Sequence, residues 1–407
     1  MSPEAGMDTI STHGTVAYFA PDLADPAVHR RVAQWRHAGH EVHAFAFARD
    51  PAMGEIPGYI SLGPLTHRSR LTRFIALGRA LARLWHWRKT LANAQLYIAR
   101  NMDNALLALF VRKMTGSSAP VVYEVLDING SCVGLGRSAR LMRRFEKWLL
   151  SRISLLVVSS PYYISAYYLP YFSYDGPWLL FENKVPQHAC PVHSVIDQAP
   201  RSESWKIGWF GFLDDEQSWR ALCRLAERLP EDVMIYVRGR PYSDFDTEAF
   251  LDDIARLNNV VYGGPYKSPD DLSAIYGAID IVWSADLNAL EGNSRWLLTN
   301  ATYEALYFGK PIISLSDTAV GDFVTEHDAG WCIEQPVEDA LIDLFSRLSE
   351  DQYRAKCATI AAIPRHRFVE SDEIEQIFRI SWPAPIHGAT APPTDTVSAG
   401  VRNSVNL

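Results

Sequence analysis

Several polar residues that could do chemistry directly follow apolar runs typical of buried strands. Asp127 ends PVVYEVLD, Asp22 follows TVAYFA, and QLYIAR leads into Asn101 and Asp103. A carboxylate held against a hydroxyl can take its proton as a general base, and amide and carboxylate side chains can hydrogen-bond hydroxyl groups. Asp127 could equally cap a helix or be a structural carboxylate at the strand end. These four residues are candidates for binding and activating a hydroxyl-bearing substrate.

The most informative segment runs from 286 to 311 and reads DLNALEGNSRWLLTNATYEALYFGKP. It resembles nucleotide-sugar glycosyltransferases of the GT-B fold, especially family-4-like enzymes of bacterial exopolysaccharide synthesis. The resemblance is most specific in NSRWLL and YEALYFGKP. Those enzymes place a strand, a phosphate-facing loop and a helix at this point. The resemblance therefore implies a donor site for a nucleoside-diphosphate sugar, for example a UDP-sugar.

On this resemblance Glu304 accepts hydrogen bonds from the ribose hydroxyls of the donor, for which a carboxylate is well suited. A helix is predicted over roughly 296–307, with Asn293, Ser294 and Arg295 at its start. Free amides and the positive end of a helix favour a diphosphate there, and Arg295 could add a bidentate contact. Without the resemblance, Glu304 and Arg295 would be interpreted as surface residues of this helix.

The sequence departs from the family pattern near the reacting sugar carbon. Many family-4 enzymes carry another glutamate eight positions before the ribose glutamate, and here that position is Trp296. Glu291 stands thirteen residues before Glu304 and is a catalytic candidate without the usual spacing. If Trp296 replaces the retaining glutamate, Asp127 is the better catalytic candidate, because the base of inverting GT-B enzymes comes from the acceptor domain.

A second departure concerns the cations that meet the donor phosphates. Related enzymes follow the glycine of the strand GWFGFLDD with an Arg and then a Lys, whereas here Phe212 follows Gly211. Gly211 still permits close approach of the backbone to the donor. Arg238 in YVRGRP is then a candidate for the phosphate charge, together with Arg295. Tyr266 in GGPYKSPDDL is a candidate for the nucleobase, and packing in the core is the equal alternative.

The elements that must position these residues form two α/β series. Strand-like and helix-like segments alternate from 15 to 160 and again from 206 to 316, as in doubly wound parallel sheets. A chain of 407 residues has the length of two ordinary domains. We predict an α/β GT-B fold with two Rossmann-like domains facing a central cleft. Its parts are a flexible N-terminus (1–14), an acceptor-binding domain (15–184), a linker (185–203), a donor-binding domain that includes the final helix (204–382) and a disordered tail (383–407).

Charge is unevenly distributed between the two halves. Up to Glu182 the chain has 20 Lys and Arg against 13 Asp and Glu, and the remainder has 19 against 34. In the basic half, the stretches 67–90 and 137–152 interleave Arg with Leu, Phe and Trp at helical spacing, as interfacial helices do. The alternative for each stretch is an ordinary helix with one solvated face and one core face. Together they predict contact with an anionic membrane surface, and the acidic second half argues against nucleic acid.

Other patterns bear on the compartment. The N-terminus lacks a basic and apolar leader, and no apolar run approaches the roughly 18 residues of a membrane span. The five cysteines are scattered and form no CxxC pair, which argues against a disulfide framework or a zinc site. We expect a cytoplasmic protein that is peripherally associated with the inner face of the cell membrane.

The combined expectation is a glycosyltransferase of exopolysaccharide or cell-surface glycan synthesis. It would move a hexose from a nucleoside-diphosphate sugar to a saccharide acceptor, expected to be linked to polyprenyl diphosphate. By analogy with GT-B enzymes we expect no metal or other cofactor, and Asp214 and Asp215 are adjacent rather than spaced as a DxD pair. Two alternatives stay open. A sugar-nucleotide epimerase or hydrolase of the same fold would use no lipid acceptor, and a catalytically inactive GT-B scaffold protein would not turn over.

Overall fold

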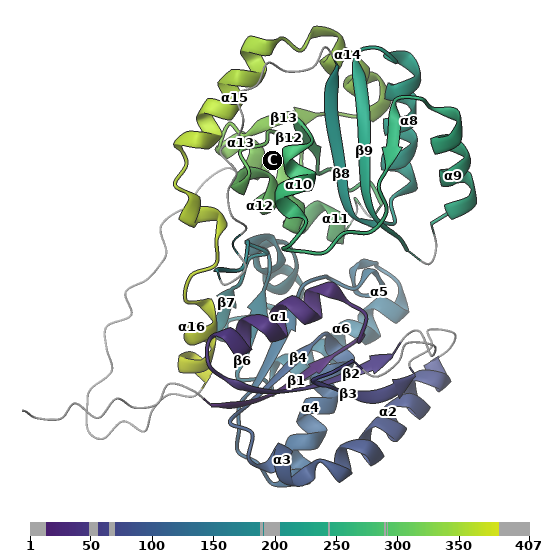
Figure 1. The fold of residues 1–407 in the computed structure, drawn as a ribbon. Coiled ribbons are helices and arrows are strands. Elements are labelled where there is room, and N and C mark those ends of the chain that lie inside the picture. Colours follow the sequence, from purple (N-terminus) through teal and green to yellow (C-terminus); the bar gives the residue numbers. More distant parts are fainter. Residues whose placement is uncertain are drawn as a thin grey trace, which may run out of the picture.

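The computed structural model describes residues 14–48, 56–64, 70–187, 190, 204–242, 245–288, 290 and 292–381, without the side chains of 70–74. The predicted tail, nearly all of the predicted flexible N-terminus and most of the predicted linker lie outside these ranges. The described chain forms two α/β domains, one above the other in Figure 1. The prediction of two doubly wound halves is therefore confirmed.

The first domain is built on a seven-stranded sheet in the order β3-β2-β1-β4-β5-β6-β7, with every pairing parallel. Its central strands are buried on both faces, which explains their continuous apolar sequences. The strands are β1 (Thr15–Ala20), β2 (Glu41–Ala48), β3 (Tyr59–Pro64), β4 (Leu96–Arg100), β5 (Val121–Val125), β6 (Leu155–Val158) and β7 (Trp178–Leu180).

Helices cover both faces of this sheet. Apolar residues of α2, α4 and α6 share one core with the inward side chains of the strands, and those of α1 belong to a second core on the opposite face. The helices are α1 (Pro26–His37), α2 (Arg70–His86), α3 (Arg88–Ala92), α4 (Met102–Thr115), α5 (Gly130–Val133), α6 (Arg137–Leu150), the π-helix η1 (Tyr163–Tyr168) and α7 (Leu169–Phe172).

The second domain is built on a six-stranded parallel sheet in the order β10-β9-β8-β11-β12-β13. Its strands are β8 (Trp205–Leu213), β9 (Val233–Pro241), β10 (Val260–Tyr262), β11 (Ile281–Trp283), β12 (Ile312–Leu315) and β13 (Gly330–Ile333). Its helices are α8 (Glu216–Arg228), α9 (Thr247–Arg256), α10 (Leu272–Gly277), α11 (Asn293–Trp296), α12 (Asn300–Tyr307), α13 (Ala319–Glu326), α14 (Val337–Arg347) and α15 (Glu350–Ala362).

The prediction of one helix over 296–307 is wrong. Trp296 is the last residue of the one-turn helix α11. The backbone is extended at Leu297, and the separate helix α12 begins at Asn300. The Thr299 hydroxyl accepts a hydrogen bond from the Thr302 amide and so caps α12, and the Leu298 carbonyl accepts one from Asn183 Nδ2 at 2.9 Å. These side-chain contacts compete with a continuous helix. The positive end of the Glu304 helix is therefore at Asn300 and not at Asn293.

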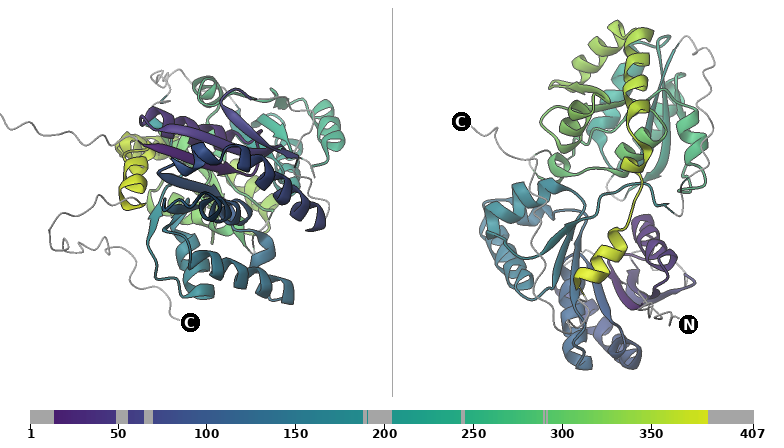
Figure 2. Two further views of the ribbon diagram at one scale, coloured as in Figure 1. Left: turned by 90° about the horizontal axis from the view of Figure 1, so that it is seen from below. Right: turned by 90° about the vertical axis from the view of Figure 1, so that its left-hand side faces the viewer.

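The last helix lies on the other domain from the one predicted. After the 3-10 helix η3 (Arg365–Phe368), the chain crosses back, and α16 (Glu373–Ser381) packs on the first sheet. Figure 2 shows this yellow segment leaving the second domain and ending against the first. Ile374 and Ile377 are buried in the same core as α1, which fixes the position of α16. The predicted boundary at 382 thus assigns α16 to the wrong domain.

Candidate functional site

Side chains of the two domains meet between the ends of their strands. Asn293 of α11 makes the most extensive of these contacts. Its Oδ1 accepts from the Ile128 amide at 2.8 Å and lies 2.9 Å from the Tyr163 hydroxyl, while its Nδ2 donates to Asp127 Oδ1 at 3.1 Å. Asn293 was predicted to bind a diphosphate. With these three contacts, its side chain instead joins the domains and holds Asp127.

Asp127 lies just beyond the end of β5, as the sequence predicts, and its carboxylate is accessible to water. The protein that surrounds the Asp127 carboxylate reduces its hydration, and this raises its pKa. The hydrogen bond from Asn293 lowers the same pKa. The negative charges of Asp25 and Asp286 also raise this pKa. A carboxylate that is held in one orientation and has a raised pKa is suited to accept a proton.

Carboxylates of the second domain face Asp127 from the other side of the junction. Asp214 follows β8 and Asp286 follows β11, and the charge of Asp286 raises the pKa of both Asp127 and Asp214. Burial and these neighbours raise the pKa of Asp214 to about 6. Ser294, a predicted phosphate ligand, is buried and hydrogen-bonded to Asp286. The sequence analysis missed the role of Asp286, although its position after a strand was the available signal.

Asp215 has a structural role. Its Oδ1 accepts from the Gln217 and Ser218 amides and thereby caps α8. Its Oδ2 accepts from the Leu287 amide at 2.6 Å. Asp215 therefore fixes the loop that carries Asp286.

Trp296, which replaces the glutamate of many family-4 enzymes, packs against the first domain. It contacts that domain's core, and its ring centroid lies 6.3 Å from that of Tyr167. Tyr167 in turn donates to the buried Glu146 at 2.5 Å. An indole cannot act as a nucleophile or base here, so position 296 contributes packing between the domains. Glu291, the other catalytic candidate of this loop, lies outside the described residues.

Glu304 is 5% exposed on α12 and accepts a hydrogen bond from the Tyr276 hydroxyl at 2.9 Å. Burial raises its pKa, against the effects of the Arg30 guanidinium and the Tyr276 hydroxyl. Arg30 of α1 lies 4.0 Å from its Oε1. Tyr266 is half-buried, and its pKa is raised by burial and by the charge of Glu304. The structure thus brings together the predicted ribose ligand and the predicted base-binding residue.

The two cations predicted to meet the donor phosphates, Arg238 and Arg295, lie in different environments. Arg238 is held by the loop before Tyr266, because its Nε donates to the Gly264 carbonyl and its Nη2 to the Pro265 carbonyl, each at 3.1 Å. Arg295 is exposed and makes no ion pair within the part of the chain that the structure describes. Gly211 has φ of 125°, and a Cβ there would meet nothing within 4 Å, so the backbone is open on that side.

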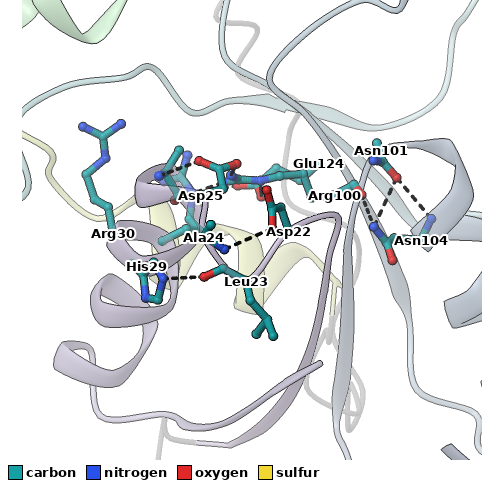
Figure 3. A network of polar contacts seen from close by, with 12 residues as sticks. Asp22, Leu23, Ala24, Asp25, His29, Arg30, Arg100, Asn101, Asn104 and Glu124 are labelled. Atoms are coloured by element: carbon teal, nitrogen blue, oxygen red, sulfur yellow. Dashed lines mark hydrogen bonds and ion pairs between the residues drawn. The ribbon is translucent and has the colours of Figure 1, made fainter. Parts of the chain in front are cut away.

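Two of the three predicted acceptor residues, Asp22 and Asn101, lie just beyond the ends of the neighbouring strands β1 and β4 (Figure 3). Asp22 is buried, and its Oδ1 accepts from the Ala24 amide at 3.1 Å. Asn101 caps α4 through its Oδ1 and has φ of 69° and ψ of 170°, a strained conformation that residues other than glycine seldom adopt. Asp103 is in the first turn of that helix. Asn101 is exposed toward the junction edge, whereas Asp22 is engaged in its own turn.

Beneath these residues lies a buried ionic network that the sequence analysis did not predict. Glu124 is 2% exposed and pairs with Arg31 at 2.6 Å and Arg100 at 3.2 Å, and the Tyr18 hydroxyl donates to it at 2.5 Å. Burial alone would raise the pKa of Glu124, but the two guanidinium groups outweigh burial and lower it. Arg100 also reaches Asp25 at the start of α1 (Figure 3). The network fixes α1 against the strand ends.

No three His, Cys, Asp or Glu side chains among the described residues are grouped so that they could hold a metal ion. No helix in the described ranges has the length and apolar character needed to cross a membrane.

No protein-family model matches the chain. The chain is 31% identical over 347 residues to the succinoglycan biosynthesis protein ExoL of Rhizobium meliloti (strain 1021), a match that covers 83% of this chain and 85% of that protein.

Solved structures match over most of both chains. HepE of Anabaena, solved in complex with UDP-glucose, has a TM-score of 0.65 at 15% identity, covering 90% of this chain and 98% of that one. Sucrose-phosphate synthase of Thermosynechococcus elongatus has a TM-score of 0.63 at 16% identity, covering 90% and 96%. At such identities the likeness shows the fold, and the predicted GT-B fold is confirmed.

Proposed function

Since the chain belongs to the same family as the succinoglycan biosynthesis protein ExoL, we propose that it is a glycosyltransferase of exopolysaccharide or cell-surface glycan synthesis. It takes a hexose from a nucleoside-diphosphate sugar and transfers it to a saccharide acceptor. The observation that carries this proposal is the setting of Glu304, a buried carboxylate in the helix that begins at the domain junction.

The donor lies along α12 with its ribose at Glu304. The vicinal hydroxyls of the ribose donate to this carboxylate, and Tyr266 borders the base. The diphosphate meets the first amides of α12, at Asn300, because these amides have no partner within the helix and carry its positive end. The UDP-glucose bound to HepE is the reason for testing uridine nucleotides first.

Transfer proceeds with inversion at the sugar carbon. The acceptor hydroxyl attacks that carbon, the bond to the diphosphate oxygen breaks with its electron pair leaving on the diphosphate, and Asp127 takes the hydroxyl proton. Trp296 packs between the domains in place of the glutamate expected for retention. The charge on the leaving diphosphate is stabilised by the helix end, so the proposal requires no metal ion.

The acceptor is linked to a lipid, and the first domain meets the membrane through α6. Its outer side combines exposed apolar residues, Leu141 and Trp148, with exposed cations, Arg140 and Arg144, while Leu149 enters the core. Leu135, just before this helix, is 87% exposed. Such a surface suits an anionic bilayer, where each cation contributes about 1 kcal/mol.

The transferase proposal is tested by incubating the protein with radiolabelled UDP-sugars and a membrane lipid extract. We expect label to enter the lipid phase with wild type and with the exposed-residue control Glu338→Gln, and not with Glu304→Ala. Conversion of the sugar without lipid labelling would instead support the epimerase or hydrolase alternative. Donor binding without any turnover would support the scaffold alternative, and the absence of both would contradict the donor site.

The membrane proposal is tested separately by co-sedimentation with vesicles. Binding to vesicles containing anionic lipid is expected to fall in the double variant Arg140→Gln, Arg144→Gln. The matched double variant Arg220→Gln, Arg224→Gln on α8 of the second domain is expected to bind as wild type does. Equal binding by both variants would contradict the assignment to α6.

A further inference from the structure

Arg30 is the first domain's cation nearest to the proposed ribose ligand. It lies on α1, and its Nη2 donates to Asn300 Oδ1 at 2.6 Å, while its Nη1 is 4.0 Å from Glu304 Oε1. Asn300 is the first residue of α12. Figure 3 shows the Arg30 side chain turned away from Asp25, Arg100 and Glu124, the buried network at the base of its helix. Arg30 thus reaches out of its own domain to the end of α12.

This position is electrostatically unfavourable for a cation by itself. The start of α12 carries the positive end of the helix dipole. The side chain of Arg30 is 19% exposed, and the loss of water lowers its pKa. Glu304, whose nearer oxygen is 4.0 Å away, and Glu370 compensate for this loss only in part. An anion bound between Arg30 and the first amides of α12 would satisfy both positive groups.

Apart from Arg295 of α11, which is exposed, the second domain offers little positive charge at this point. Phe212 and Asp214 follow Gly211, where the family pattern has cations. Arg238 donates to two backbone carbonyls, and Asp286 adds negative charge beyond β11. A diphosphate approaching this domain alone would therefore meet these carboxylates together with the exposed Arg295.

We propose that Arg30 binds the donor's diphosphate, so that the first domain adds a phosphate cation to the Arg295 that the second domain offers. This inference rests on the proposed donor site. When the diphosphate is bound, the guanidinium contacts it and keeps its contact with Asn300. The ribose hydroxyls then donate hydrogen bonds to the negatively charged Glu304 carboxylate. Since the donor is held by both domains, nucleotide binding stabilises their approach.

The experiment compares a nucleoside diphosphate with its nucleoside. UDP, ADP, GDP and dTDP are titrated calorimetrically into wild type, and the one that binds is paired with its nucleoside. Arg30→Gln is expected to weaken diphosphate binding roughly 10- to 100-fold, as for loss of a hydrogen bond to a charged group. Nucleoside binding is expected to change less than about threefold, because the nucleoside carries no charge for Arg30 to meet. Arg30→Lys should recover part of the loss.

Arg36→Gln is the matched control, since Arg36 is exposed at the other end of the same helix and contacts the Gly58 carbonyl. If Arg30→Gln weakens the diphosphate and the nucleoside equally, Arg30 only joins the domains and the inference is wrong. Unchanged diphosphate binding in Arg30→Gln would also overturn it, while leaving the donor site intact. If wild type binds none of the four nucleotides, the proposed donor site itself fails.

Discussion

At the residue scale, the catalytic assignment depends on a contact between residues far apart in the sequence. Asp127 and Asn293 come from different domains, and their hydrogen bond orients the carboxylate toward the junction. Asp214 and Asp286 surround it with further negative charge. Such a setting favours proton uptake, because desolvation and like charges both oppose the ionised form.

Asp127→Asn is expected to reduce kcat roughly 100- to 10,000-fold, the usual contribution of a general base, with little change in nucleotide affinity. In wild type, kcat should fall as the pH falls through the raised pKa of Asp127, since the protonated carboxyl cannot accept a proton. That acidic limb should be absent from the residual activity of the variant. A pH profile of initial rates, with nucleotide binding measured in parallel, checks both expectations. Full activity in Asp127→Asn would contradict its role as the base.

Single candidate residues could be proposed from the sequence, whereas their partners could not. Glu304 and Tyr266 became candidates because they lie in segments with a family pattern, and their roles toward the donor stay predictions. Arg30 could not be paired with Asn300, 270 positions away, because nothing in the local sequence of either residue encodes that contact. Asn293 was assigned to phosphate because it was predicted to lie at the start of the Glu304 helix, where free backbone amides favour a diphosphate. That helix begins at Asn300, and the side chain of Asn293 binds the first domain.

At the scale of elements, α12 is positioned by a group of hydroxyls at its start. Thr299 Oγ1 lies 3.1 Å from Ser284 Oγ and 2.9 Å from Thr302 Oγ1, which ties the helix start to the end of β11. The apolar segment before it predicts a continuous helix, and only the cap and the contact from Asn183 break it. The strands, in contrast, could be predicted well, since burial on both faces leaves an apolar run in the sequence.

Thr299→Ala removes the cap of α12. We expect a loss of about 1 kcal/mol in stability, seen as a Tm decrease of about 2–4 °C, together with weaker binding of the nucleoside diphosphate. Thr299→Ser retains the hydroxyl and should preserve both properties. Thermal unfolding monitored with and without nucleotide measures the two effects together. An unchanged Tm in Thr299→Ala would show that the cap contributes little to the position of α12.

Glu370, in the segment that crosses from η3 to α16, should make stability depend on pH. Its side chain is 9% exposed, and burial raises its pKa to about 7 despite the nearby charges of Arg31 and Arg30. Between about pH 4.5 and pH 7 the folded state therefore keeps a proton that the unfolded state has lost, so stability falls as the pH rises.

Glu370→Gln cannot titrate and should lack this loss. Relative to wild type, the variant is expected to gain up to about 3 kcal/mol between pH 4.5 and pH 7.5. Denaturant unfolding of both proteins across that range provides the measurement, and the difference between them cancels the other titrating groups. A difference that stays constant with pH would show that Glu370 ionises normally in the folded protein.

At the scale of the whole molecule, the charge asymmetry has a structural counterpart. The basic half is the first domain, and its two helical stretches each place one side in the core, as the simpler interpretation of such stretches requires. The simpler interpretation holds for α6, and its outer side also exposes apolar residues among cations, as the membrane proposal requires. For the other stretch, the segment 67–69 and the side chains of 70–74 lie outside the described residues. The sequence could predict the uneven charge, but which side of each helix faces water depends on packing.

The arrangement of the two domains depends on α11, which belongs to the second domain but packs on the first. Asn293→Ala removes its three polar contacts and is expected to loosen the junction, which small-angle scattering would detect as a larger radius of gyration. Asn258→Ala, at an exposed position, should leave the scattering unchanged.

Asn293→Ala should also shift the acidic limb of the kcat profile to higher pH, because the hydrogen bond from Asn293 lowers the pKa of Asp127. A larger radius with an unshifted limb would mean that α11 holds the domains together without tuning the base, whereas both changes together would tie domain approach to catalysis.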